Sequence, residues 1–172
     1  PNYILNKKNV LPDFIDPFKV ESVDGFAMIL NLRKLKKIDQ FKDNNFFDEN
    51  IFLYLENDDL CKRINKFENI FIVPKSKINH LGASGVNKKY SEQIELSRNW
   101  HWIWSKFYFN KKHYGFLKAM FECFPSFLSA ILKVLFYFLI NNNKKGIYLH
   151  RVLGFLNALL GKKSYHRPKI DN

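Results

Sequence analysis

Three carboxylates lie within four consecutive positions of the sequence, at Glu56, Asp58 and Asp59, with Asn57 between them. They stand where a helix is expected to begin, and one such side chain is explained by capping and by the helix dipole. Three together repel one another, which favours a nearby cation or a positively charged part of a substrate. A carboxylate held at a helix start can also act as a general base toward an attacking hydroxyl group.

His80 is the second candidate for chemistry, because it follows an apolar segment and precedes a Gly/Ser-rich loop at residues 82–85. A lone histidine is more often structural than functional. A neutral imidazole at this place can nevertheless join carboxylates around Mg or Mn. No other histidine is close in sequence, so this region does not complete a metal site by itself.

Short elements of two kinds must position these side chains. Apolar runs at residues 23–30 and 71–73 predict strands, and residues 32–41 and those after Asn57 predict helices. The alternation indicates an α/β fold. Within residues 23–30, Gly25 and Ala27 are small, which allows either a ligand to approach the backbone or close packing.

The second half of the chain differs in charge and composition. Residues 1–97 hold 15 Lys and Arg against 14 Asp and Glu, whereas residues 98–172 hold 13 against 2. Aromatic and basic residues alternate over residues 95–114, and apolar helices are expected within residues 116–140 and 147–160, the second ending at Gly161. Such a segment suits an anionic membrane surface or a single-stranded nucleic acid.

The apolar run favours the membrane, since nucleic-acid binding does not require it. Pro125 and Lys133 interrupt the run, and a central lysine costs roughly 2.5–3.5 kcal/mol on insertion scales. We therefore expect helices that lie in the membrane interface, with a true span and packing on the domain as the alternatives. The two cysteines, Cys61 and Cys123, indicate neither a metal site nor a disulfide framework.

Four segments over residues 23–84 resemble, in the expected order, family 2 glycosyltransferases of the rhamnosyltransferase type. The match covers the small-residue segment at 23–30, the Phe-Asp-Glu loop at 46–49, and residues 52–63, which resemble the family's Tyr-Glu-Asp-x-Asp-Leu segment. The fourth segment is a strand at 71–74 followed by His80-Leu81-Gly82-Ala83-Ser84, which is similar to the family's strand and His-x-x-Gly-x-Ser element. Each segment alone is weak evidence for the family, but the four segments occur in the family's order, which makes the resemblance specific.

The resemblance implies the C-terminal part of a Rossmann-like GT-A domain, a nucleotide-sugar donor and a divalent metal, Mg or Mn. It places the catalytic base among the acidic cluster, Asp24, Gly25, Ala27 and Asn57 near the sugars, and the metal at His80. In many family members the base directly follows the Glu, and here that position is Asn57. Glu56, Asp58 or Asp59 would then have to act as the base.

The expected organisation is an acceptor-side half-domain at residues 1–97 and a basic helical tail at 98–172. The family's nucleotide-binding half has no counterpart before Val23, so we expect a fragment that transfers no sugar alone. The expected function is inverting transfer to a glycan or lipid-linked acceptor in polysaccharide synthesis. Residues 98–160 would contact the cytoplasmic face of the cell membrane, with no nucleic-acid partner. The alternative is a non-enzymatic membrane- or nucleic-acid-binding module.

Overall fold

The computed structural model describes residues 16–79 and 87–168. Of these residues, 56% are helical and 4% lie in strands. The chain forms two compact units, one from residues 1–48 and 56–82, the other from residues 49–55 and 83–172. The expected α/β fold of a Rossmann-like GT-A domain is therefore wrong, because the described residues form a single two-stranded sheet and mostly helices.

The first unit combines a small sheet with short helices around one apolar cluster. Strands β1 (Phe18–Val20) and β2 (Ile70–Ile72) pair antiparallel, with Lys19 opposite Phe71. The unit also contains α1 (Leu32–Leu35), the 3₁₀ helix η1 (Asp39–Phe41) and α2 (Glu56–Ile64). Its buried cluster is Leu35, Phe41, Leu60 and Ile64. The apolar spacing of α2 places Leu60 and Ile64 in this core, as the sequence predicts.

The strand expected at residues 23–30 does not form. Residues 25–27 make a turn, and the strand of this region lies earlier, at β1. Met28 and Leu30 pack on the apolar cluster while Ile29 is fully exposed. This alternation imitates a half-buried strand, but residues 22 and 23 bond to side chains of α2 instead of to a neighbouring strand.

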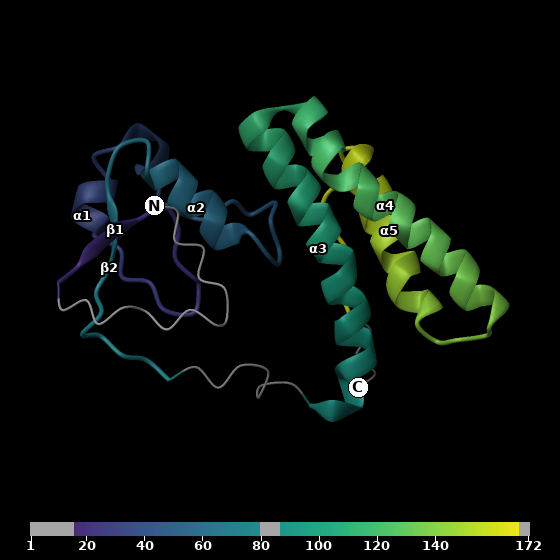
Figure 1. Cartoon of the computed structure of the whole chain (residues 1–172). Coiled ribbons are helices and arrows are strands. Elements are labelled where there is room, and N and C mark those ends of the chain that lie inside the picture. The colour runs from purple at the N-terminus through teal and green to yellow at the C-terminus, as the bar shows by residue number, and fades with distance from the viewer. Residues whose placement is uncertain (1–15, 80–86, 169–172) are drawn as a thin grey trace. The chain divides into compact units, whose positions relative to one another are not determined.

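The second unit is a bundle of three helices in which every pair is in contact (Figure 1). The helices are α3 (Ser91–Tyr114), α4 (Phe116–Leu139) and α5 (Lys145–Leu159), preceded by the 3₁₀ helix η2 (Lys88–Tyr90). The helix α3 passes through residue 97, so the boundary expected there falls inside a helix. The core consists of Trp100, Ile103, Trp104, Phe107, Ala119, Cys123, Phe155 and Ala158.

Gly154 lets α5 approach α3 closely. A Cβ atom at this position would lie 2.3 Å from the carbonyl oxygen of Trp100, well inside van der Waals contact. Gly161 lies just beyond the end of α5, as predicted, and its φ of 69° is a conformation that glycine adopts without strain. The amides of Gly161 and Lys162 donate to the carbonyls of Ala158 and Asn157, which is the Schellman pattern.

Candidate functional site

The acidic cluster lies in the first turn of α2, where its members have different surroundings. Asp59 is fully buried, and its Oδ2 lies 2.8 Å from Nε of Arg63. Arg63 also donates to the carbonyl of Phe46 and lies over the ring of Phe41 at 5.1 Å. This buried ion pair ties α2 to residues 41–46, so Asp59 has a positioning role. Its Oδ2 is engaged by Arg63, unlike the unpartnered oxygen of Glu56.

Residues 22–25 pack against the beginning of α2. Ser22 Oγ donates to Oδ1 of Asp58 at 2.6 Å, and Asn57 Nδ2 donates to the carbonyl of Val23 at 2.8 Å. A Cβ atom on Gly25 would lie 3.3 Å from the Cβ of Asn57. Two segments that the resemblance places at one site, 23–30 and 52–63, therefore meet in space. Gly25 serves close packing against Asn57 here, the second of the two readings that the sequence left open.

Glu56 differs from its neighbours because its Oε2 is buried and has no hydrogen-bond partner among the described residues. It is the first residue of α2, where the helix dipole favours a negative charge. A buried carboxylate oxygen without a hydrogen bond carries a desolvation cost, and a hydroxyl group that enters the site would supply the missing bond. The structure thus distinguishes Glu56 from Asp58 and Asp59, which the sequence could not do.

The remaining predicted site residues contribute less. Asp24 is exposed at the turn and Ala27 is half-buried beside it. His80 lies outside the described residues. Over residues 16–79 and 87–168, no three His, Cys, Asp or Glu side chains are grouped so that they could hold a metal ion.

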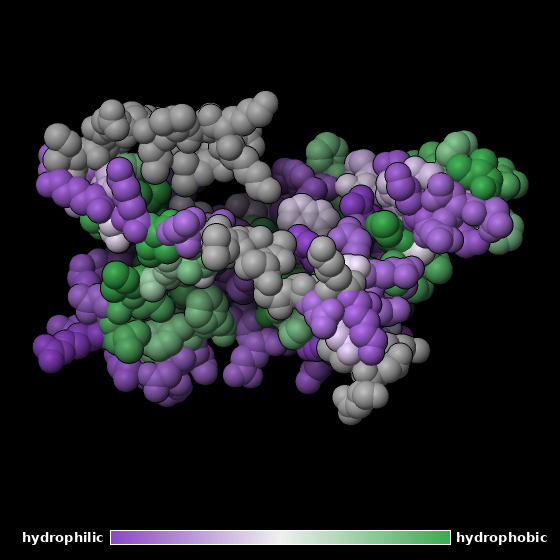
Figure 2. All heavy atoms as spheres, turned by 90° about the horizontal axis from the view of Figure 1, so that it is seen from below, coloured by the Kyte–Doolittle hydropathy of each residue, from purple (hydrophilic) through white to green (hydrophobic). Residues whose placement is uncertain are grey.

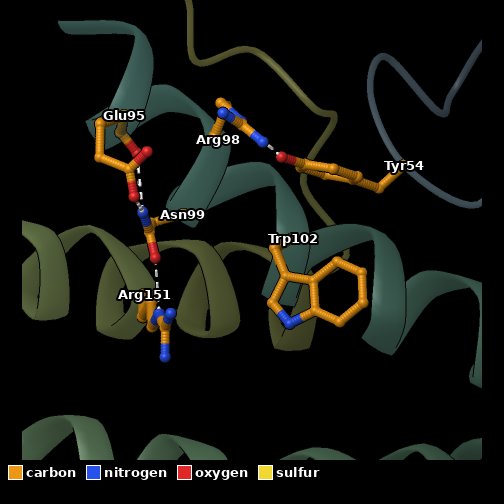
Figure 3. Close-up of a pocket in the computed structure, with 6 residues that line it drawn as sticks. All are labelled: Tyr54, Glu95, Arg98, Asn99, Trp102 and Arg151. Carbon is orange, nitrogen blue, oxygen red and sulfur yellow. Dashed lines mark hydrogen bonds between the residues drawn. The ribbon is translucent and has the colours of Figure 1, made fainter. Parts of the chain in front are cut away.

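A pocket in the helical unit was not predicted from the sequence. It has a volume of about 220 Å³ and is lined by Tyr54, Glu95, Arg98, Asn99, Trp102 and Arg151 (Figure 3). Four of these residues are spaced three, four and seven apart on α3, which places them on one helix face. That spacing was a signal in the sequence. The contribution of Arg151 depends on the packing of α5 against α3 and was not foreseeable.

The segment before Glu56 has an unusual backbone. Tyr54 and Leu55 both adopt left-handed conformations, with φ of 68° and 66°. Such conformations are costly for side chains other than glycine and persist where surrounding contacts impose them. Ser105 Oγ donates to the carbonyl of Leu53 at 2.7 Å, and Arg98 Nε donates to the hydroxyl of Tyr54 at 2.8 Å. These two bonds hold the segment on α3.

Helix α4 carries an exposed apolar stripe along its length. It has the length and composition of a membrane-crossing helix, and only 17% of its most apolar window is buried. The stripe repeats every three or four residues through Leu117, Phe121, Phe124, Leu128, Leu132, Leu135 and Leu139. At the right of Figure 2, hydrophobic residues gather where α4 leads into α5, next to hydrophilic ones. Exposed apolar surface of this extent marks an interaction surface.

Comparisons with known proteins give no family assignment, since no family model, no curated protein and no solved structure matches the chain.

Proposed function

We propose that this chain is the acceptor-side part of an inverting glycosyltransferase that uses a nucleotide-sugar donor and a glycan or lipid-linked acceptor in polysaccharide synthesis. The supporting observation is the unpartnered oxygen of the Glu56 carboxylate in the first turn of α2, against which residues 22–25 pack. A carboxylate that served only as a helix cap would accept hydrogen bonds from backbone N–H groups of the first turn, so its oxygens would not be left without a partner.

In this proposal Glu56 is the general base. Its carboxylate removes the proton from the acceptor hydroxyl while the hydroxyl oxygen attacks the anomeric carbon of the donor. The bond from that carbon to the nucleotide diphosphate breaks on the opposite face, which inverts the anomeric configuration. Asn57, bound to the carbonyl of Val23, and the Asp59–Arg63 ion pair keep the helix start in place.

Substitution of single carboxylates in the complete encoded protein tests this role. Glu56→Gln keeps the size of the side chain and removes the base, so we expect kcat to fall about 10²–10⁴-fold with little change in the KM for the donor. Asp59→Asn is the matched control, because it changes a carboxylate of the same helix turn that pairs with Arg63. It should lower the free energy of unfolding while leaving kcat per folded molecule nearly unchanged. A Glu56→Gln rate within twofold of wild type would show that Glu56 is a helix-start residue only.

We further propose that α4 and α5 hold the protein on the cytoplasmic face of a membrane, through residues 98–160. The exposed stripe of α4 supplies apolar area, and residues 98–172 carry eleven more basic than acidic side chains. Apolar burial and attraction to anionic lipid add to each other in interfacial binding. We expect stronger sedimentation with anionic than with neutral phosphatidylcholine vesicles. Absence of binding to both would contradict this placement.

A further inference from the structure

The pocket of the helical unit presents two arginines from different helices, Arg98 on α3 and Arg151 on α5 (Figure 3). Arg98 donates through Nε to the hydroxyl of Tyr54 at 2.8 Å, and Arg151 donates through Nε to Oδ1 of Asn99 at 2.7 Å. Each guanidinium is thereby held through one nitrogen. No acceptor within the described part of the chain bonds their terminal nitrogens, which therefore remain able to bind an anion.

The charge of the pocket is positive. Among the described residues that line it, Glu95 is the single acidic one, and its Oε1 accepts from Nδ2 of Asn99 at 2.7 Å. The hydrogen bond that Arg98 donates to the Tyr54 hydroxyl raises the pKa of Arg98 above its usual value, so this side chain stays charged at any physiological pH. Two arginines against one carboxylate attract an anion, and a doubly charged one more strongly than a singly charged one.

An exposed indole lies at the same pocket. Trp102 is 45% exposed, and its ring meets the ring of Tyr54 edge to face with centroids 5.4 Å apart. The other two tryptophans, Trp100 and Trp104, are buried in the core. A tryptophan left outside the core beside cationic groups offers a flat apolar surface to a ligand that also carries a charge.

The size of the pocket limits the ligand. Pockets for drug-sized molecules span about 300–1,000 Å³, and this pocket has about 220 Å³. A phosphate group and part of one adjoining ring fit that volume better than a whole nucleotide sugar does.

We propose that this pocket binds a sugar phosphate, with the phosphate on Arg98 and Arg151 and the sugar ring against Trp102. The same chemistry occurs in free glycosyl phosphates and in sugars linked to a nucleotide through phosphate. All six lining residues belong to the helical unit. The inference therefore does not depend on catalysis by Glu56.

Titration of the 172-residue chain with glucose 1-phosphate tests the proposal, and glucose and sodium sulfate serve as separate references. The readout is the NMR resonance of the indole N–H of Trp102, the exposed one of the three tryptophans. We expect a saturable shift at millimolar concentrations of glucose 1-phosphate and no such shift with glucose. A parallel titration with uridine diphosphate distinguishes the sources. Binding about tenfold tighter than that of glucose 1-phosphate would assign the pocket to nucleotide-linked sugars.

Variants connect the shift to the two arginines. Arg98→Gln and Arg151→Gln should each weaken binding at least tenfold, whereas Lys111→Gln, an exposed cation of the same helix, should leave it unchanged. Tyr54→Phe removes one hydroxyl, keeps the ring, and should weaken binding severalfold by freeing Arg98. Circular dichroism confirms that each variant retains its helices. The proposal is overturned if sulfate gives the same shift, or if Tyr54→Phe and both arginine variants bind like wild type.

Discussion

The buried histidine of the helical unit predicts an acid-sensitive fold. His101 is fully buried on α3, and both of its ring nitrogens are bonded. Nε2 lies 2.7 Å from the carbonyl of His166, and Nδ1 lies 2.9 Å from Oγ of Ser164. A carbonyl can only accept, so Nε2 carries the proton and Nδ1 accepts from the Ser164 hydroxyl. These bonds fasten residues 164–166 to α3.

Burial lowers the pKa of His101 from 6.5 to about 4. A folded-state pKa below the unfolded value means that the unfolded chain binds the proton more tightly. The stabilising contribution is therefore complete above pH 6.5 and is lost as the pH falls toward 4. At about 1.4 kcal/mol for each pKa unit, the unit should lose about 2 kcal/mol of unfolding free energy between pH 7 and pH 5.

Tryptophan emission is a selective assay, because Trp100, Trp102 and Trp104 all lie on α3. Urea unfolding of the whole chain, followed by this emission from pH 5 to pH 7.5, gives the stability of the helical unit. In His101→Gln the side-chain amide replaces the ring N–H as a hydrogen-bond donor but does not titrate. This variant should lose most of the pH dependence of the unfolding free energy. His166→Gln keeps the backbone carbonyl that accepts from His101 and removes a second histidine whose pKa burial lowers, so it should lose a smaller share of the pH dependence than His101→Gln. Equal pH dependence in wild type and His101→Gln would refute the reasoning.

Two further substitutions test the packing and the membrane surface, each with a control on the same helix. Gly154→Ala should destabilise the helical unit by about 1–3 kcal/mol in the same urea assay, because its Cβ would meet the Trp100 carbonyl at 2.3 Å. Gly146→Ala, with ordinary contact at 3.5 Å, should be neutral or stabilising, and equal effects would contradict the close approach of α5. Leu132→Glu should lower the affinity for anionic vesicles about tenfold at unchanged stability. Ser126→Glu, which lies outside the exposed apolar stripe of α4, should change the affinity little. Equal losses of affinity in the two variants would contradict docking through the stripe.

Local signals in the sequence located several elements correctly. The acidic residues and the spacing of Leu60 and Ile64 marked the start and the buried face of α2, and Gly161 marked the end of α5. The apolar run before Pro74 became β2. These features depend on neighbours within one or two turns, which the sequence displays directly.

Features that depend on distant partners were not predictable in the same way. The segment at 23–30 has the alternation of a strand, yet contacts with α2 hold its first residues outside any sheet. The carboxylates of the acidic cluster differ because Ser22 bonds to Asp58 and Arg63 pairs with Asp59, and the sequence alone does not show these contacts. The bond from Arg151 to Asn99 likewise joins residues 52 positions apart.

The most direct test of the proposed function is an assay of sugar transfer by the protein in the presence of membranes from the cells that produce it. Labelled nucleotide sugars are supplied one at a time, and the glycan and lipid fractions are analysed for label and for the anomeric configuration of the new bond. The account predicts transfer from one donor class with inverted configuration, and loss of that transfer in Glu56→Gln. Retained configuration, or no transfer from any donor by folded protein, would contradict it.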